Sequence, residues 1–190
     1  MTLRISGGRK LLSPPGAIAR PTASRVRLAV MNLLADTVPG CRWLDLCCGS
    51  GVMACEALQR GAREVVAIER DRRVAAIARQ NLEAVASSLQ ASGQGEPYRV
   101  INAEAQRWLV LDPPSGGTRE PFDLIYLDPP WPAGLHRPLS EAVRHGGWLR
   151  REGTLIWECP SDHRPEVPEG WRLSDERRYG GSTLVLLHQV

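Results

Sequence analysis

The sequence predicts an α/β fold in which a mostly parallel, seven-stranded sheet ends in an antiparallel C-terminal strand. Short apolar runs alternate along the chain with segments whose apolar residues recur at helical spacing, which is typical of parallel strands joined by helical crossovers. Breaks rich in glycine and proline separate these segments. The last two apolar runs meet at Gly180-Gly181, and so short a turn joins antiparallel neighbours. These three observations define the fold class.

Each expected element follows from its own local pattern. Strands are expected at residues 42–47, 64–69, 98–102, 122–127, 153–159, 171–179 and 183–188. Helices are expected at residues 52–60, 71–89, 105–111 and 135–145, and a further helix capped by Thr22 extends to about residue 35. Residues 3–6 and 9–12 flank Gly7-Gly8 and predict a short hairpin. Residues 112–121 predict a surface loop, because paired prolines followed by glycines exclude regular structure.

Length and composition exclude several classes of protein. The chain has 190 residues, 43% of them hydrophobic and 24% charged, which fits one soluble domain or one domain with a short appendage. No apolar run approaches the roughly 20 residues of a membrane span, and the N-terminus lacks the apolar core of a secretory signal. The five cysteines show no C-x-x-C spacing. We therefore expect no disulfide framework, no metal site, no membrane association and a cytoplasmic location.

Positive charge is concentrated near the N-terminus. The first 35 residues contain six basic residues and no acidic one, whereas the whole chain carries a net charge of only +3. The six are Arg4, Arg9, Lys10, Arg20, Arg25 and Arg27. A basic segment on a near-neutral body predicts a polyanionic partner such as nucleic acid, although solvated cationic termini are also common. We therefore divide the chain into a basic arm with its helix, residues 1–38, and an α/β domain, residues 39–190.

A glycine-rich turn follows the first strand of the α/β domain, in residues 44–51 (LDLCCGSG). Gly49 and Gly51 allow the backbone to approach a ligand, and the next helix offers free N–H groups at its N-terminus. The spacing also fits a dinucleotide fingerprint. Asp45 would repel a pyrophosphate, but it could accept hydrogen bonds from an ammonium group such as that of S-adenosylmethionine. The alternative is that Asp45 only braces the turn.

Two more acidic residues follow the next two strands. Glu69 ends the second strand, where a carboxylate can accept hydrogen bonds from both ribose hydroxyls of a nucleoside. This feature supports a nucleoside cofactor without choosing between NAD and S-adenosylmethionine. Glu104 comes directly after the third strand and is placed to meet an adenine edge, although a glutamate with no ligand explains this position almost as well.

The second motif is Asp128-Pro129-Pro130-Trp131, at the carboxyl end of the fourth strand, where open α/β sheets bind their ligands. The two prolines make the backbone rigid and present the carbonyl of Pro129 outward. That carbonyl and the Asp128 carboxylate can accept both N–H bonds of an exocyclic base amine and stabilise the positive charge that grows on its nitrogen. Trp131 can stack on a base that has left its helix. The pattern predicts amino methylation of a nucleobase.

Taken together, these residues resemble the RsmD-type bacterial rRNA methyltransferases, a class I family that methylates N2 of a guanine in 16S rRNA. The resemblance runs nearly end to end. Its matching residues are Arg4-Ile5-Ser6-Gly7-Gly8, Arg20-Pro21-Thr22, Arg25-Val26-Arg27, Asn32-Leu33-Leu34, residues 44–51, Glu56-Ala57-Leu58, Arg60-Gly61-Ala62, Glu69, Asn81-Leu82, Asp128-Pro129-Pro130 and Tyr179-Gly180. The N-terminal arm and the Arg-Pro-Thr run are the most diagnostic of these, because many methyltransferases share the rest.

The resemblance implies a role for each group of residues. S-adenosylmethionine would be bound by Asp45, Cys47, Gly49, Gly51, Glu69, Arg70 and Glu104. The guanine would be held by Asp128, Pro129, Pro130 and Trp131, which form the expected catalytic set. The RNA would be contacted by Arg4, Arg9, Lys10, Arg20, Thr22 and Arg25. The expected partner is 16S rRNA, alone or in a small-subunit particle, and the expected oligomeric state is a monomer.

The sequence departs from the family pattern at three sites. Cys47-Cys48 replace the usual Phe-Ala, Met31 replaces a usual Phe, and Trp131 replaces the commoner Tyr or Phe. A nucleophilic Cys48, as in enzymes that methylate pyrimidine carbon 5, is disfavoured because amine methylation needs no covalent intermediate.

Two other functions remain open. An Asp-Pro-Pro-aromatic motif also occurs in enzymes that methylate N6 of adenine. Guanine is favoured because its N1–H lies beside the N2 amine, so that one carboxylate can accept from both groups. An NAD-dependent oxidoreductase would need a catalytic His, Lys or Tyr in the cleft, and the only lysine is Lys10. The sequence does not identify the modified guanine.

Overall fold

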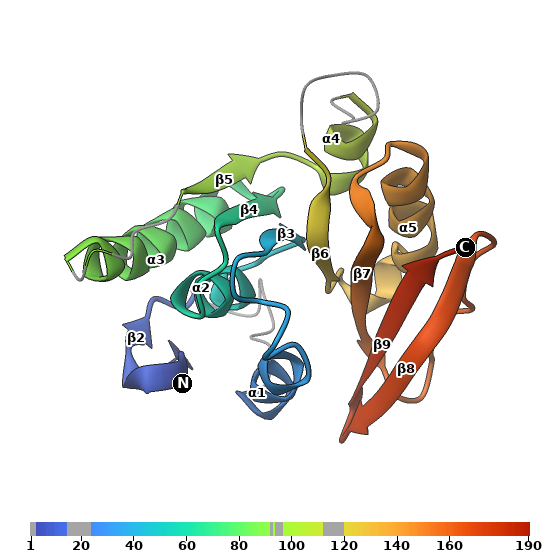
Figure 1. The fold of residues 1–190 in the computed structure, drawn as a ribbon, viewed down its shortest axis with the longest axis horizontal. Coiled ribbons are helices and arrows are strands. Elements are labelled where there is room, and N and C mark those ends of the chain that lie inside the picture. The colour runs from blue at the N-terminus through green and yellow to red at the C-terminus, as the bar shows by residue number, and fades with distance from the viewer. Residues whose placement is uncertain (1–2, 15–23, 92, 94–96, 112–119) are drawn as a thin grey trace. The chain divides into compact units, whose positions relative to one another are not determined.

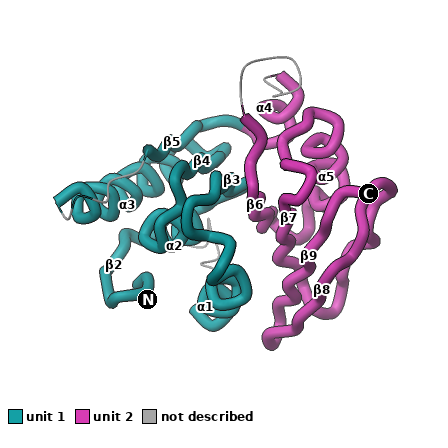
Figure 2. The backbone as a smooth tube through the Cα atoms, viewed as in Figure 1, with its two compact units in different colours: residues 1–103 teal, residues 104–190 magenta. Residues whose placement is uncertain are grey.

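A computed structural model describes residues 3–14, 24–91, 93, 97–111 and 120–190. The chain forms two compact units, residues 1–103 and residues 104–190 (Figure 2). Figure 1 labels the elements of each unit. The main sheet has seven strands in the order β5-β4-β3-β6-β7-β9-β8. This confirms the predicted α/β class with a mostly parallel sheet. The boundary at residues 38 and 39 stays a prediction, and the described N-terminal elements lie within the first unit.

In the first unit, three parallel strands alternate with two helices. The strands are β3 (Arg42–Leu46), β4 (Glu64–Glu69) and β5 (Tyr98–Asn102), and their registers pair Asp45 with Ala67 and Glu69 with Asn102. The helices are α2 (Val52–Gln59) and α3 (Arg72–Ala91), which pack against each other. Residues 52–58 of α2 are all buried, so this helix lies inside the unit.

The N-terminal elements of the first unit are short. Strands β1 (Leu3–Arg4) and β2 (Lys10–Leu11) are antiparallel and are joined through a 3-10 turn, η1 (Ser6–Gly8). The turn requires Gly7 and Gly8, whose φ angles are +78° and +82°. Helix α1 (Ser24–Leu33) packs against α2. The predicted hairpin is therefore confirmed, whereas the predicted cap Thr22 lies outside the described residues.

The second unit contains the C-terminal part of the sheet. Its strands are β6 (Phe122–Leu127), β7 (Leu149–Pro160), β8 (Trp171–Tyr179) and β9 (Ser182–Gln189). Strands β6 and β7 are parallel, and β9 runs antiparallel to both β7 and β8. The helical elements are α4 (Ala105–Leu111), η3 (Trp131–Ala133) and α5 (His136–His145). The antiparallel C-terminal strand is thereby confirmed.

The predicted starts of β7 and α3 differ from the observed ones for identifiable reasons. Strand β7 begins at Leu149 instead of residue 153, because a register shift after Phe122 places Thr154 opposite Leu124. The charged residues 150–152 lie in this irregularity and hid the strand from the pattern. Helix α3 begins at Arg72, since the Asp71 carboxylate accepts hydrogen bonds from the backbone N–H groups of Arg73 (2.8 Å) and Val74 (3.0 Å) and so acts as its cap.

Candidate functional site

The glycine turn after β3 contains three left-handed residues at alternate positions. Cys47, Gly49 and Gly51 have φ angles of +63°, +55° and +75°. A Cβ on Gly51 would lie 3.1 Å from the Cβ of Ala78 on α3, so this glycine allows the start of α2 to pack against α3. Cys47 is half-buried and adopts a conformation that costs a residue with a side chain about 1 kcal/mol. A strained backbone of this kind is common where a fold presents its main chain to a ligand.

Asp45 lies inside the turn and is only 1% exposed. Its Oδ2 accepts a hydrogen bond from the backbone N–H of Ala54 at 3.1 Å. The residue that precedes α2, Gly51, has no side chain to cap the helix, so Asp45 supplies the missing acceptor from the neighbouring strand. Burial raises the pKa of Asp45 to about 8, and the charge on Glu69 adds to that rise. The geometry therefore places Asp45 as a brace of the turn, and its contact with an ammonium group stays a prediction.

Glu69 ties the two loops of the candidate cofactor site together. Its Oε2 accepts a hydrogen bond from the N–H of Gly49 (3.0 Å), and its Oε1 accepts one from the N–H of Asp71 (2.8 Å). Burial raises the pKa of Glu69, and these two backbone donors oppose the rise. A carboxylate has about four acceptor positions, so two hydroxyl donors can still be accommodated. Glu69 therefore shapes the turn, and its ribose-binding role stays a prediction.

Asn102, at the end of β5, also contacts the loop after β4, and the sequence motifs did not reveal this residue. Its Nδ2 donates hydrogen bonds to the carbonyls of Glu69 and Arg70, each at 2.9 Å. The backbone of Arg70 is thus fixed while its side chain is exposed. A polar residue at the carboxyl end of a parallel strand was the available signal.

Glu104 lies in the second unit, immediately before α4. Its two carboxylate oxygens accept hydrogen bonds from the N–H groups of Gln106 (3.0 Å) and Arg107 (2.7 Å). Glu104 therefore caps α4, which accounts for an acidic residue at this position without a ligand. Its predicted contact with adenine remains untested.

Two buried cysteines near the turn, Cys48 and Cys55, are unsuited to nucleophilic attack. Cys48 is buried, and burial raises the pKa of its thiol well above the ordinary value, with further contributions from Asp45 and Glu69. Burial likewise raises the pKa of Cys55. A thiol that stays protonated at neutral pH is a poor nucleophile. Among the described residues, no group of three or more His, Cys, Asp and Glu side chains is arranged to bind a metal ion.

The Asp128-Pro129-Pro130-Trp131 motif, which the sequence assigns to the target base and which is called the target-base motif below, follows β6 in the second unit. Asp128 and Trp131 are half-buried, Pro129 is buried and Pro130 is exposed. The carbonyl of Pro130 accepts a hydrogen bond from the N–H of Ala133 at 2.9 Å, which closes the 3-10 turn η3. The contact of the Pro129 carbonyl with the base stays a prediction. Gly134, with φ of +61°, ends the turn.

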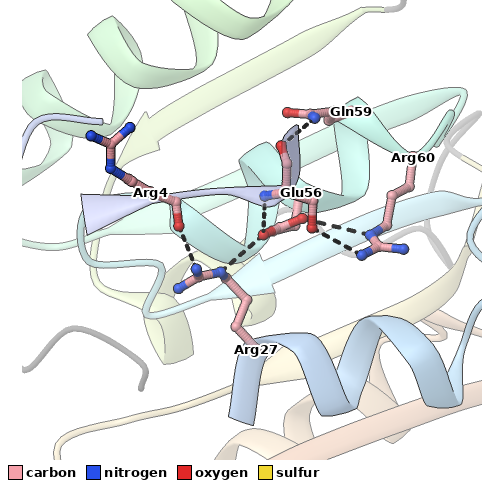
Figure 3. A network of polar contacts seen from close by, with 6 residues as sticks. Arg4, Arg27, Glu56, Gln59 and Arg60 are labelled. Atoms are coloured by element: carbon pink, nitrogen blue, oxygen red, sulfur yellow. Dashed lines mark hydrogen bonds and ion pairs between the residues drawn. The ribbon is translucent and has the colours of Figure 1, made fainter. Parts of the chain in front are cut away.

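Figure 3 shows how the N-terminal arm is fastened to α2. The fully buried Glu56 accepts hydrogen bonds at Oε1 from the backbone N–H of Ser6 (3.0 Å) and from Nε of Arg27 (2.9 Å). Arg60 lies beside it, with Nε 3.6 Å from Oε2. Arg27 also donates to the carbonyl of Arg4, and Gln59 donates to the carbonyl of Ser6 at 2.5 Å. The arm is thus an integral part of the first unit.

A second anchor holds the end of the arm. The Oδ1 of Asn81 on α3 accepts a hydrogen bond from the N–H of Leu12 (2.8 Å), and its Nδ2 donates to the carbonyls of Leu12 (3.0 Å) and Ser50 (2.9 Å). Asn81 is 2% exposed, so these bonds are shielded from water. The same side chain connects the arm to the glycine turn.

The predicted RNA contacts divide into three groups. Lys10 and Arg25 are exposed, as is Arg4, whose guanidinium donates to the carbonyl of Gly8 at 2.7 Å. Arg9 donates to the carbonyl of Ala84 at 3.2 Å. Arg20 and Thr22 lie outside the described residues. Arg27, which the sequence counted with the basic arm, is buried against Glu56, and the charge that the arm exposes is correspondingly smaller.

The chain is similar to known proteins along almost its whole length. The model of the family described as Conserved hypothetical protein 95 matches residues 3–188. Ribosomal RNA small subunit methyltransferase D of Escherichia coli K12 is 33% identical over 183 residues, covering 94% of this chain and 85% of that protein. The Haemophilus influenzae protein of the same name is 30% identical over 173 residues, covering 91% and 84% of the two chains.

Solved structures show the same relationship. The chain matches yhhF of Escherichia coli with a TM-score of 0.78 and 31% identity, covering 100% of this chain and 98% of that one. It also matches the rRNA methyltransferase aviRa of Streptomyces viridochromogenes with a TM-score of 0.70, covering 94% and 88% of the two chains. At 18% identity, the second match shows a shared fold alone.

Proposed function

The chain belongs to the Conserved hypothetical protein 95 family, together with ribosomal RNA small subunit methyltransferase D, and on this basis we propose that it methylates the N2 amine of a guanine in 16S rRNA. The methyl donor is S-adenosylmethionine. The observation that carries the proposal is the Asp128-Pro129-Pro130-Trp131 motif at the carboxyl end of β6, in a chain that resembles these relatives end to end. The natural substrate is rRNA in the cytoplasm, free or in a small-subunit particle, and the enzyme acts as a monomer.

The residues of the first unit suit a nucleoside with a cationic amino acid. Three left-handed residues present the backbone at the turn, and the Glu69 carboxylate has capacity to accept hydroxyl donors. We assign the ribose to Glu69 and the remaining cofactor contacts to Asp45, Cys47, Gly49, Gly51, Arg70 and Glu104. When bound, the cofactor supplies an electrophilic methyl group.

The residues of the second unit suit the target base. The Asp128 carboxylate accepts hydrogen bonds from guanine N1–H and from the N2 amine, and the Pro129 carbonyl accepts the other amine hydrogen. These acceptors stabilise the positive charge that develops on N2 during attack. Trp131 stacks on the base and holds its plane. The barrier falls because donor and amine are held in line, without a covalent intermediate on the enzyme.

Equilibrium dialysis tests the choice of cofactor. We expect S-adenosylmethionine to bind and NADH not to bind, because the turn carries a carboxyl group where a pyrophosphate would need backbone donors alone. Binding of NADH with no binding of S-adenosylmethionine would replace the proposal with an oxidoreductase.

The choice of base is tested by nucleoside analysis and by the variant Asp128→Asn. We expect label from S-adenosylmethionine in N2-methylguanosine, and we expect the variant to lose activity by about 100-fold to 1,000-fold, since one charged acceptor is removed from the developing charge. Label in N6-methyladenosine would favour the adenine alternative. Full guanine methylation by Asp128→Asn would contradict the two-donor role of Asp128.

A further inference from the structure

A buried polar cluster in the second unit is centred on Glu158 of β7. Glu158 is 3% exposed, and its carboxylate accepts two hydroxyl hydrogen bonds. The hydroxyl of Tyr126 donates to Oε2 at 2.5 Å, and the hydroxyl of Ser182 donates to Oε1 at 2.9 Å. The first distance is in the range of hydroxyl-to-carboxylate bonds, which are stronger than neutral ones. Tyr126, on β6, is itself only 1% exposed.

The main chain of Glu158 makes a second connection, to the start of α5. Nε2 of His136, which is 2% exposed, lies 2.9 Å from the carbonyl oxygen of Glu158. A carbonyl only accepts, so Nε2 carries the hydrogen of this bond. Burial lowers the pKa of His136, which keeps the ring neutral at pH 7. Ser140 donates to the carbonyl of His136 at 2.7 Å, and Nε1 of Trp157 donates to Ser140 at 3.0 Å.

The two connections fall on either side of the target-base motif. Tyr126 precedes Asp128 by two residues, and His136 follows Trp131 by five residues. Strand β6 pairs with β7 in parallel up to Leu127, which lies opposite Trp157, so the motif begins where this pairing ends and Glu158 is the residue after Trp157. Glu158 therefore bonds through its side chain to β6, which precedes the motif, and through its main chain to α5, which follows it.

A contribution to stability alone does not account for this arrangement. Burying a carboxylate costs several kcal/mol, and replacing a buried charged group by apolar residues of similar size is often neutral or stabilising. A rigid polar clamp is useful where geometry limits the rate. Methyl transfer is such a case, because a displacement of about 1 Å at the reacting groups costs roughly 100-fold in rate.

We propose that Glu158 is a positioning residue for methyl transfer, which acts by holding Tyr126 and His136 and thereby fixes the place of Asp128 and Trp131. Glu158 is assigned no contact with the substrate or the cofactor. The inference rests on the proposed function, because it requires the motif to bind the target base. The inference adds a functional residue that lies outside both the glycine-rich turn and the Asp128-Pro129-Pro130-Trp131 motif, namely the hydrogen-bond acceptor Glu158 on β7.

Steady-state kinetics of Tyr126→Phe and Glu158→Gln, with small-subunit particles as substrate, test the clamp. Each variant removes a hydrogen bond and keeps the size of its side chain. We expect kcat to fall about 10-fold to 100-fold, while the KM for particles and the Kd for S-adenosylmethionine change less than about threefold. The double variant should be no worse than about the poorer single variant, because the Tyr126–Glu158 hydrogen bond is the interaction that the two changes share.

The matched control is Ser161→Ala, which removes the 2.9 Å hydrogen bond between Ser161, directly after β7, and Thr183 of β9. It should leave kcat within about twofold of the wild type, since it touches neither Tyr126 nor His136. Thermal melting of every variant shows whether it is folded at the assay temperature. If Glu158→Gln is unfolded there, Tyr126→Phe carries the test.

Two results would overturn the inference. One is a wild-type kcat, within about twofold, in folded Tyr126→Phe and Glu158→Gln. The other is an equal loss of kcat in Ser161→Ala, which would mean that the sheet is generally sensitive. If the wild-type protein itself places no label in guanine, the proposed function fails, and that result is distinct from both.

Discussion

Asp45 shows how one side chain can serve both the fold and a binding site. It braces the first turn of α2 through Ala54, and it lies in the turn to which the sequence assigns the cofactor. Burial raises the pKa of Asp45 to about 8, so the carboxyl group is mainly protonated at neutral pH in the free protein. A cationic ligand beside it would favour the carboxylate and draw the pKa down. The glycine turn thus contains a carboxyl group whose charge would change when a cationic ligand binds beside it.

The stability of the protein should therefore depend on pH through Asp45. Its pKa in the folded state is about 8 and in the unfolded state about 4, so the folded chain holds more protons between these pH values. The free energy of unfolding then falls as pH rises through this range, by at most about 1.4 kcal/mol per pH unit. Asp45→Asn removes this dependence. The free energy of unfolding of the variant, measured relative to that of the wild type, should therefore increase as pH rises.

Urea denaturation of both proteins at pH 5, 6.5 and 8 measures the difference. Asp36→Asn, which changes an exposed residue, is the control and should show no such trend. A difference between Asp45→Asn and wild type that stays constant across the three pH values would contradict the raised pKa.

At the scale of elements, the arm is better described as a packed part of the first unit than as a tail. Three side chains of α2 and α3, Glu56, Gln59 and Asn81, bond to its main chain. A cavity of about 430 Å³ lies between the arm and these helices, lined by Gly7, Gly8, Arg9, Gln59, Val85, Ser88 and Leu89. Because the main chain of the arm is anchored, the backbone positions of Arg4 and Lys10 are fixed, and their exposed side chains are available to contact a polyanion.

The variant Glu56→Gln tests the anchor. It leaves the buried Arg27 and the partly exposed Arg60 without their shared negative partner, and removing one partner of a buried pair such as Arg27–Glu56 costs about 3–5 kcal/mol. We expect the free energy of unfolding to fall by about that amount, and hydrogen exchange at the N–H groups of Ile5 and Gly8 to accelerate. Denaturation and exchange mass spectrometry measure the two effects.

The control for this anchor is Glu141→Gln, which breaks an exposed pair with Arg137 on α5. That change should cost less than about 1 kcal/mol. Equal costs for Glu56→Gln and Glu141→Gln would show that the arm does not depend on the buried pair.

The elements also show what a sequence can predict. Strand β4 was predicted to the residue, because Val65 to Ile68 form a buried run between polar ends. The start of β7 was missed, since its bulge places charged residues inside a strand. The glycine turn and the Asp128 motif follow from local spacing. Apart from Arg60, the side-chain partners of Glu56 and Glu158 come from segments 24 to 50 residues away, so local patterns could reveal only that a charged residue lies in an apolar run.

At the scale of the whole molecule, the charge that the chain exposes differs from the charge it contains. Arg27 is neutralised inside the first unit, whereas Arg4, Lys10 and Arg25 are exposed. None of the helices in the described ranges is both long and apolar enough to cross a membrane. Contacts of exposed basic residues with phosphates make affinity for RNA fall with salt concentration.

Replacing Arg4, Lys10 and Arg25 together by alanine should therefore weaken binding to small-subunit rRNA. It should also reduce the slope of log affinity against log salt by roughly one for each phosphate contact that is lost. The affinity for S-adenosylmethionine should not change. Filter binding over a range of salt concentrations measures the slope, and Arg151→Ala, an exposed arginine of the second unit, is the control. An unchanged slope would exclude these three residues from RNA binding.

The central claim is that this chain methylates N2 of a guanine in small-subunit rRNA. Its most direct test uses small-subunit particles from an Escherichia coli strain that lacks ribosomal RNA small subunit methyltransferase D, incubated with this protein and labelled S-adenosylmethionine. The account predicts label in N2-methylguanosine of 16S rRNA with the wild type, and a loss of about 100-fold or more with Asp128→Asn. Label in any other nucleoside, or none in a protein that binds S-adenosylmethionine, would contradict it.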